Sequence, residues 1–343
     1  MNTHQKQQLD YEFIAKNSLN LSFGKIGIEK ECLRVLNQQI SQKPHPAIWG
    51  SSLCNSFLTN DFSEAQPELI TLPFNDNKET LDFLEKLHHY VSHTLGEEIL
   101  WPLSMPPSLN EIDIPIASFG NSNQGKFKQI YRNGLSHRYG KLMQVISGVH
   151  FNYSLPEEIL EVLLNEYKDS ERNDVRSEYY LKMLRNVLRM NWIIIYFFGA
   201  SPLIPKDFIK EKSEDFSEAD NKTAYLPYAT SLRMSEFGYQ NLSRASLKVS
   251  SNSLHEYTEG LMNATRKIND AYKEINIKYG DHAQLNQCFL QIEDEYYAAV
   301  RAKSNDPSNQ RFITKLTKGG INFLEIRSLD LNPFSRIGIN NET

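Results

Sequence analysis

The stretch "GKIGIEKECLRV", residues 24 to 35, reads as a β-strand that carries carboxylates on an otherwise aliphatic face. In the two-residue period of a strand, Glu29 and Glu31 share a face with the aliphatic side chains two and four positions beyond Glu31. A carboxylate that faces a protein interior costs free energy unless a metal ion or a basic side chain compensates its charge. A half-exposed strand end with solvated glutamates is the third interpretation, and this stretch alone leaves all three open.

The composition is that of an ordinary soluble globular protein. The chain has 343 residues, 40% hydrophobic and 23% charged, which is enough for one large core or two smaller ones. A formal net charge of -5 provides no basic surface for nucleic acid. Three cysteines, an odd and sparse set, argue against a disulfide framework and favour a reducing cytosol. We therefore expect a cytoplasmic protein with no nucleic-acid partner.

Neither a membrane span nor a signal peptide is predicted. The polar opening "MNTHQKQQLDYEF" lacks the apolar core of a secretory signal. The most apolar run, "MNWIIIYFFGASPL" at residues 190 to 203, is shorter than the roughly 20 residues that cross a bilayer. We expect this run to form the buried end of a helix, and we expect no membrane partner.

Helical and strand-like patterns are interspersed along the chain without a regular βαβ rhythm. Leucine and valine at helical spacing in "KETLDFLEKLHHYVSHTLG", residues 78–96, indicate one helix clearly. Helices are expected over 78–96, 125–139, 156–168, 175–198 and 253–278, and strands over 24–36, 66–72, 141–154, 285–293 and 319–331. The charged stretch 205–223 is expected to be a loop. This order favours the α+β class with a mostly antiparallel sheet over a doubly wound fold.

The stretch "GNSNQGKF", residues 120 to 127, nearly matches a phosphate-binding loop. Gly120, Gly125 and Lys126 fit the pattern G-x-x-x-x-G-K. Phe127, however, stands where a serine or threonine must hold magnesium, and no buried parallel strand precedes the stretch. The favoured interpretation is a glycine-rich turn that enters a helix.

The stretch "HHYVSH" places His89 and His93 four residues apart on an expected helix, a spacing that can bind zinc. The glutamate of a zinc-protease motif is absent, and no cysteine lies near in the sequence. The favoured interpretation is an exposed flank of the helix.

Acidic residues recur on or beside several expected strands. They are Asp61, Glu64 and Glu68 in "TNDFSEAQPELIT", and Glu325, with Arg327, in "GGINFLEIRSLDLNPF"; "GVHFNYSL" adds the imidazole of His150. A buried ion pair explains the last strand when it is taken alone. Several strands that each direct a carboxylate inward, together with one imidazole, indicate a shared polar cavity. Hard divalent cations take oxygen ligands and phosphates bind metal plus arginine, so such a cavity can hold a metal–nucleotide.

Nine short stretches together resemble the bacterial glutamate–cysteine ligase (γ-glutamylcysteine synthetase) family. They are "GIEKECLRV", "TNDFSEAQPELIT", "WPLSMP", "SNQGKFKQIYRNGLSHRYG", "MQVISGVHFNYSLP", "FFGASP", "YLPYATSLRMSEFGY", "LQIEDEYYAAVRAK" and "GGINFLEIRSLDLNPFSRIG". The resemblance implies one ligase catalytic domain over residues 1–343, with a cupped, mostly antiparallel sheet flanked by helices, related to glutamine synthetase. It also implies ATP-dependent joining of the L-glutamate γ-carboxylate to the L-cysteine amine through a γ-glutamyl phosphate, the first step of glutathione biosynthesis.

The same resemblance assigns roles to individual residues. The implied ligands of Mg2+ or Mn2+ are Glu29, Glu31, Asp61, Glu68, His150 and Glu325, and we expect these six residues to line one cavity. The implied phosphate-binding catalytic residue is Arg327. The implied substrate-binding residues are Arg233 and Tyr239 for amino-acid carboxylates, and Tyr131, Arg132 and Tyr297 for cysteine. ATP is the implied co-substrate.

One departure from the family concerns length. Family members continue well past "SLDLNPFSRIG" with a part that is expected to be mostly helical, whereas this sequence ends at Thr343. We therefore expect an exposed apolar patch over residues 156–200 and 253–278. Two alternatives stay open: a chain that binds metal–nucleotide without turnover, and a sibling ligase that couples glutamate to another amine.

Overall fold

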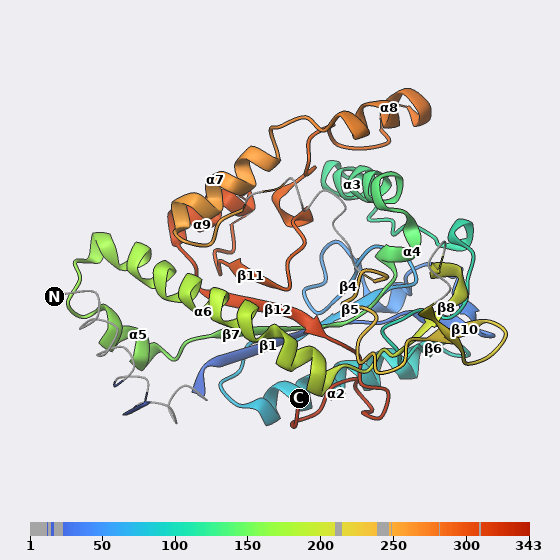
Figure 1. Cartoon of the computed structure of the whole chain (residues 1–343), viewed down its shortest axis with the longest axis horizontal. Coiled ribbons are helices and arrows are strands. Elements are labelled where there is room, and N and C mark those ends of the chain that lie inside the picture. Colours follow the sequence, from blue (N-terminus) through green and yellow to red (C-terminus); the bar gives the residue numbers. More distant parts are fainter. Residues whose placement is uncertain are drawn as a thin grey trace.

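The computed structural model describes residues 12, 15, 16, 23–209, 215–238, 247, 249–280, 282–308 and 310–343. Its centre is a six-stranded sheet in which all neighbouring strands are antiparallel. In sheet order the strands are β11 (Val300–Lys303), β12 (Phe323–Leu329), β7 (Val149–Ser154), β1 (Lys25–Glu31), β5 (Pro67–Ile70) and β4 (Leu58–Asn60). The class is therefore α+β with a mostly antiparallel sheet flanked by helices, which confirms the sequence-based prediction (Figure 1).

The register of the central strands divides the sheet into a polar and an apolar face. Glu29 of β1 lies opposite His150 of β7, and Glu31 lies opposite Glu68 of β5. Residues directly opposite each other in an antiparallel pair project from the same face. Alternate residues such as Ile28 therefore point to the other face, where they are buried.

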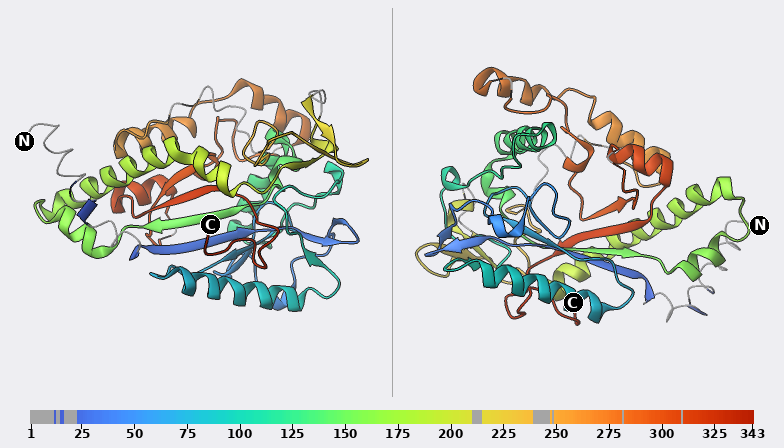
Figure 2. Two further views of the ribbon diagram at one scale, coloured as in Figure 1. Left: turned by 60° about the horizontal axis from the view of Figure 1, so that its bottom comes forward. Right: turned by 180° about the vertical axis from the view of Figure 1, so that it is seen from behind.

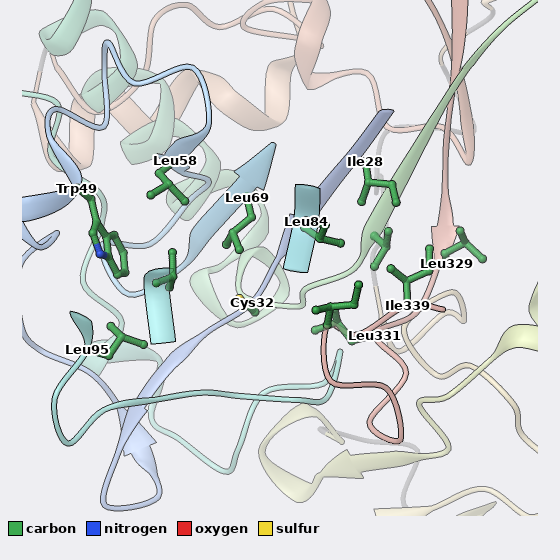
Figure 3. Close-up of a cluster of buried hydrophobic side chains, with 13 residues drawn as sticks. Ile28, Cys32, Trp49, Leu58, Leu69, Leu84, Leu95, Leu329, Leu331 and Ile339 are labelled. Atoms are coloured by element: carbon green, nitrogen blue, oxygen red, sulfur yellow. The ribbon is translucent and has the colours of Figure 1, made fainter. Parts of the chain in front are cut away.

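The apolar face is covered by α2 (Asn77–Thr94), by the C-terminal half of α6 (Asp169–Phe198) and by residues 330–343 (Figures 1 and 2). Ile28, Leu69 and Leu84 belong to one apolar cluster with Leu331 and other buried side chains (Figure 3). Asp76 caps α2 by accepting a hydrogen bond of 2.6 Å from the backbone of Lys78. Burial on this face leaves the opposite face for polar side chains.

Smaller elements complete the fold around the polar face. These are α3 (Asn123–Tyr139), α4 (Lys141–Gln144), α5 (Glu157–Leu164), α7 (Leu254–Ala264), α8 (Lys273–Tyr279), α9 (Phe312–Gly319) and the short 3-10 turn η8 (Glu293–Glu295). Two small sheets are formed by β3 (Gln39–Ile40), β2 (Arg34–Leu36) and β6 (Ile99–Leu100), and by β8 (Leu203–Pro205), β10 (Thr223–Tyr225) and β9 (Ser217–Glu218). Figure 1 shows α3 and α7 to α9 on the side of the sheet away from α2. Within the described residues, no helix is long and apolar enough to cross a membrane.

Several expected elements differ from the observed ones. The strand expected over 24–36 breaks after Glu31, because the buried guanidinium of Arg34 pairs with Glu98 at 2.9 Å and holds β2 in a separate sheet. The first part of the strand expected over 141–154 is the helix α4, whose first backbone N–H, at Lys141, donates to the Glu111 carboxylate. In both segments a carboxylate, that of Glu98 or Glu111, binds the chain and so determines its local structure.

The segment 285–293 is not a strand, and the helix expected over 253–278 is broken. The Asn286 side chain accepts a hydrogen bond from the Cys288 backbone and donates one to the Gln291 carbonyl, both at 2.9 Å, which favours a loop. The helix stops because the Ala264 carbonyl accepts the backbone N–H of Leu290 at 3.0 Å. The described part of the loop expected over 205–223 contains β9 and the start of β10.

Candidate functional site

His150 lies at the centre of a carboxylate cluster on the polar face. Its Nδ1 is 3.2 Å from Glu29 Oε2 and 3.3 Å from Glu325 Oε1, and its Nε2 is 3.4 Å from Glu31 Oε1. The imidazole is only 4% exposed. Because β7 lies between β1 and β12, one side chain in the middle of the sheet reaches acids from both neighbouring strands.

Glu68 of β5 joins this cluster. One ligand atom each from Glu29, Glu68 and His150 lie within 4.8 Å of one another. Burial is the largest cause that raises the pKa of Glu68 well above its usual range, followed by the negative charges of Glu29, Asp61 and Glu31. Burial, with the charge of Asp61, also raises the pKa of Glu31 against the opposing effect of His150. These two acids are therefore poised to gain from a nearby cation.

Asp61 follows β4 in a loop and approaches the same cluster. Its charge contributes to the raised pKa of both Glu31 and Glu68. Arg132 of α3 holds this loop, because its Nε donates to the Asp61 carbonyl at 2.5 Å. The structure therefore brings together five of the six residues for which a metal-binding role was expected, and the charge of Asp61 acts on two of them. The metal-binding role itself stays a prediction.

Glu325 has a different electrostatic environment from Glu68. Its Oε1 is 2.5 Å from Arg327 Nη1, and its Oε2 is 3.1 Å from Lys303 Nζ. Burial acts to raise the pKa of Glu325, but the combined charges of Lys303, Arg327, Arg301 and His150 outweigh it and lower the pKa well below its usual range. The ion pair that explained this strand in isolation is thus present, as part of the larger cluster.

Glu29 is also held in its charged form. Burial raises its pKa, yet the hydrogen bond with His150 and the charge of Lys303 bring it below the usual value. Asn152 Nδ2 donates to Glu29 Oε1 at 3.0 Å, while the buried Asn152 Oδ1 accepts no hydrogen bond from the described residues. Several carboxylates and an imidazole in one cluster make a donor set that fits a hard divalent cation.

A pocket adjoins the cluster on the side of α3. It is lined by residues of α3, α4, η8, β11 and β12, among them Tyr131, Tyr139, Glu295, Tyr297, Arg301 and Arg327. The Arg327 guanidinium lies 6.0 Å from the ring centroid of Tyr297. Because Arg327 both pairs with Glu325 and lines the pocket, it forms the border between the carboxylates and the pocket.

The pocket wall is anchored by a buried ion pair. Arg138 Nη1 lies 3.2 Å from Glu295 Oε1, and both side chains are almost fully buried. The hydroxyl of Tyr139 donates to the same oxygen at 2.8 Å. This anchor joins α3 to η8 and so fixes two sides of the pocket relative to each other.

Two arginines that were expected to bind substrate donate hydrogen bonds to backbone carbonyls, and their substrate-binding role stays a prediction. Arg132 donates to backbone carbonyls, including that of Asp61, and stacks at 4.4 Å on Phe119. Arg233 Nη2 donates to the Arg327 carbonyl at 2.8 Å, and its side chain is 3% exposed. Neither residue lines the pocket, whereas Tyr131 and Tyr297 do. Tyr239, the fifth expected substrate residue, lies outside the described residues.

The two motifs that were set aside contribute no side chain to the carboxylate cluster or to the pocket. Ser122 caps α3 by accepting a hydrogen bond of 3.0 Å from Gly125, and Lys126 is exposed on the first turn. "GNSNQGKF" is therefore a turn that enters a helix, as expected. His89 and His93 stack at 5.8 Å on the exposed side of α2, which covers the opposite face of the sheet.

Sequence reasoning missed β11 and its basic residues. Arg301 lies opposite Glu325 in the register, and Lys303 pairs with the same carboxylate. The signal was present as a two-residue alternation, because the apolar Val300 and Ala302 alternate in sequence with the basic Arg301 and Lys303. Four residues are too short a run to separate from a loop by pattern alone.

A comparison with known proteins accounts for this arrangement. The family model for glutamate–cysteine ligase matches residues 12–343. This chain belongs to the glutamate–cysteine ligase family. It is 47% identical over 320 residues to the glutamate–cysteine ligase of Aliivibrio salmonicida, covering 92% of this chain and 61% of that protein. The chain therefore spans about three fifths of the length of this relative.

Two solved structures are similar to this fold. The Francisella tularensis glutamate–cysteine ligase, crystallised in complex with AMP, matches with a TM-score of 0.87 and 37% identity over 93% of this chain and 64% of that one. A bifunctional glutathione synthetase from Pasteurella multocida matches with a TM-score of 0.71 and 31% identity over 95% of this chain and 38% of that one.

Proposed function

We propose that this chain carries the catalytic centre of an ATP-dependent ligase that joins the γ-carboxylate of L-glutamate to the amine of L-cysteine. The observation that carries the proposal is the convergence of Glu29, Glu31, Glu68, His150 and Glu325 on one face of four adjacent strands. Membership of the ligase family supports the reaction class. Turnover by this chain alone is part of the proposal, since the relatives are longer.

The carboxylate cluster is the proposed site for Mg2+ or Mn2+. Glu29 and Glu68 offer hard oxygen donors within 4.8 Å of each other, Glu31 approaches the same imidazole of His150, and the charge of Asp61 acts on Glu68. When bound, such a cation neutralises the charge on the ATP phosphates and on the phosphoryl group in transfer. Oxygen ligands outnumber the single imidazole, which favours magnesium or manganese over zinc.

Arg327 is the proposed phosphate-binding residue. Its side chain borders both the carboxylate cluster and the pocket, so it can meet a phosphoryl group that passes between them. A planar guanidinium presents several N–H donors in a fork that matches phosphate oxygens. Arg233 Nη2 donates a hydrogen bond of 2.8 Å to the backbone carbonyl of Arg327. We therefore assign Arg233 a positioning role.

The proposed reaction has two steps. The γ-carboxylate of glutamate attacks the terminal phosphorus of ATP, giving γ-glutamyl phosphate and ADP. The cysteine amine then attacks the acyl carbon, the carbon–oxygen bond to phosphate breaks, and the amine loses a proton. The products are γ-glutamylcysteine, ADP and inorganic phosphate. Arg327 stabilises the anionic phosphate in both steps.

The pocket beside Arg327 is the proposed site for the amine substrate. Tyr131 and Tyr297 supply an aromatic lining with hydroxyl groups, and the side chains of Arg301 and Glu295 add charge of both signs. This lining suits a small zwitterionic amino acid. We assign cysteine to it on the strength of the family relationship. The three free cysteines of the chain fit a reducing compartment, so we place the reaction in the cytoplasm.

The test is a coupled ADP-release assay on this chain with ATP, glutamate and either cysteine or another small amino acid. We expect turnover that requires magnesium or manganese and that is fastest with cysteine. Arg327→Lys keeps the charge but loses the fork, and we expect it to lower kcat by about 100-fold or more. Arg336→Lys is the matched control, because Arg336 forms an exposed 3.1 Å ion pair with Glu85 on the other side of the sheet.

The second candidate function is binding of metal–nucleotide without turnover, which is favoured by the three-fifths length match. In that case ATP with magnesium would bind with an affinity that depends on Glu68, and no ADP would be released. A higher rate with another amine would instead identify a sibling ligase. Binding that is indifferent to Glu68 and to the divalent cation would refute the proposed site itself.

A further inference from the structure

The half-buried side chain of Met234 joins two residues of the candidate site through its sulfur atom. Arg233 Nη1 donates to Met234 Sδ at 3.2 Å, and the Tyr297 hydroxyl donates to the same sulfur at 3.8 Å. A methionine that only fills a gap in a core has apolar neighbours around its sulfur. A thioether sulfur is also a weak hydrogen-bond acceptor, and here two donors from different segments use it in that way.

The backbone of Met234 is held in place by Asp330, which follows β12. The Asp330 carboxylate accepts hydrogen bonds from Ser201 Oγ at 2.7 Å and from Ser231 Oγ at 3.1 Å. Ser231 Oγ in turn accepts the backbone N–H of Met234 at 3.3 Å. Asp330, Ser201 and Ser231 are all buried. The point from which the Met234 side chain starts is therefore fixed relative to the end of β12.

The guanidinium of Arg233 is closely surrounded, and its side chain is 3% exposed. Nη2 donates to the Arg327 carbonyl at 2.8 Å, and Nη1 lies 3.9 Å from Asp330 Oδ1. Gly148, just before β7, leaves room for this group, because a Cβ atom at that position would collide with the guanidinium. Arg233 is therefore a rigid support for the sulfur of Met234.

Tyr297 is the other residue that donates to the sulfur, and its side chain lines the pocket beside Arg327. It lies in the segment between η8 and β11, and its ring centroid is 6.0 Å from the Arg327 guanidinium. The hydroxyl is at the far end of the ring, so its contact with the sulfur restrains the direction in which the ring projects. Met234 therefore connects the wall of the pocket to the rigid Arg233.

We propose that Met234 is a positioning residue for the amine substrate, because its sulfur holds the Tyr297 ring in the orientation that forms the pocket wall. The inference rests on the proposed function, in which this pocket takes the amine. Met234 is not one of the residues that line the pocket, so it acts on the substrate through Tyr297. The unbranched methionine side chain suits this role, because its rotatable bonds let the sulfur meet donors on two different segments.

The contacts predict which kinetic constant depends on Met234. A displaced Tyr297 ring weakens contacts that the amine makes in the ground state and in the transition state alike. Loss of such uniform binding raises KM and leaves kcat unchanged. Arg327 keeps its ion pair with Glu325 and the hydrogen bond from Arg233, so the KM for ATP should stay the same.

The experiment compares Met234→Leu and Met234→Gln in the coupled ADP-release assay, with cysteine as the varied substrate. Leucine keeps about the volume of methionine but has no acceptor atom. We expect Met234→Leu to raise the KM for cysteine by about threefold to tenfold, the range for loss of one neutral hydrogen bond, with kcat and the KM for ATP changed by less than about twofold.

Glutamine tests whether the acceptor, and not the bulk of the side chain, is responsible. Its side chain is unbranched and ends in an amide oxygen, so Met234→Gln should keep the KM for cysteine within about twofold of the value for the unsubstituted chain. Met262→Leu is the matched control, because Met262 is a half-buried methionine of α7 that does not line the pocket.

A second readout follows Tyr297 itself and needs no turnover. In protein labelled with fluorotyrosine, the fluorine NMR resonance of Tyr297 is identified by its loss in Tyr297→Phe. A fluorine atom beside the hydroxyl reports the hydrogen bond of that hydroxyl and the orientation of the ring. We expect the resonance to shift in Met234→Leu and to stay in place in Met262→Leu.

Three results would overturn the proposal. One is a Tyr297 resonance that does not move in Met234→Leu. Another is a KM for cysteine that Met234→Leu leaves within about twofold of the unsubstituted value. The third is an equal loss in kcat and in every KM together with a lower melting temperature, which identifies a merely structural role. Absence of turnover by the unsubstituted chain with any amine would instead refute the proposed function, and the resonance would then decide alone whether Met234 holds the Tyr297 ring.

Discussion

Glu68→Gln should make the metal-free protein more stable at neutral pH. Glu68 and Glu29 offer oxygens within 4.8 Å of each other, and two unit charges at that distance repel by about 3.5 kcal/mol at an effective dielectric constant of about 20. His150 offsets part of this repulsion. We therefore expect the neutral amide to raise the free energy of unfolding by about 1–3 kcal/mol at pH 7.

The pH dependence of this gain has a definite sign. Because the folded-state pKa of Glu68 is raised, the folded protein binds the proton more tightly than the unfolded chain does. The cost of ionising Glu68 is therefore fully present above the raised pKa and disappears as the pH falls to the unfolded value of 4.5. Urea denaturation followed by circular dichroism, at pH 7 and near pH 4 with EDTA, should show the gain only at pH 7.

Glu29→Gln is the matched control. Glu29 belongs to the same carboxylate cluster as Glu68. In the structure it accepts a hydrogen bond from Asn152 at 3.0 Å, and its pKa is lowered despite burial. We expect Glu29→Gln to be neutral or destabilising. Equal gains from both substitutions, or a loss from Glu68→Gln at pH 7, would refute this account of the cluster.

Three further outcomes test other parts of the fold. Burial, with the nearby charges of Lys30 and Arg336, lowers the pKa of His88 to about 4. The free energy of unfolding should therefore fall as the pH is lowered from 6.5 to 4, because the unfolded chain binds the proton more tightly. In denaturation experiments His88→Gln should reduce that fall by about 1–2 kcal/mol, a figure that allows for the partial exposure of the side chain. Arg138→Met leaves the buried Glu295 carboxylate uncompensated and should lower the free energy of unfolding by about 3–5 kcal/mol, whereas adding Glu295→Gln should restore part of it. Lys126→Ala should change the affinity for magnesium–ATP by less than about twofold in calorimetry, and a loss beyond about 1.4 kcal/mol (tenfold) would mean that "GNSNQGK" binds phosphate after all.

Sequence patterns predicted the long helices and strands because the spacing of apolar side chains within each segment is enough to indicate them. The leucine and valine spacing of 78–96 became α2, and the alternation around Glu29 placed the carboxylates on one face of β1. β11 was missed because its four residues become a strand only by pairing with β12. The strand expected over 285–293 failed because side-chain hydrogen bonds of Asn286 compete with a ladder, and that competition has no periodic signature.

The sequence predicted which residues belong to the candidate site, but it did not predict how their side chains are arranged. The resemblance named Glu29, Glu68 and His150, and the structure places them together. It could not separate arginines that line a pocket from those that hold the backbone. Arg327 lines the pocket, whereas Arg233 donates to a carbonyl, and both are arginines in matching stretches. That difference depends on packing between segments far apart in the sequence.

The strand order also has a consequence for how the chain folds during synthesis. β7 is made long before its neighbour β12, because about 170 residues separate them, or about 10–30 s at about 5–20 residues per second. During that interval β7 is an open edge that can pair with other chains. The emerging half-sheet carries Glu29, Glu31 and Glu68 but not yet the cationic Lys303 and Arg327. Lys303 and Arg327 reach the acids only when β12 pairs with β7 and β11 pairs with β12, so the charge balance of the cluster is completed late in synthesis.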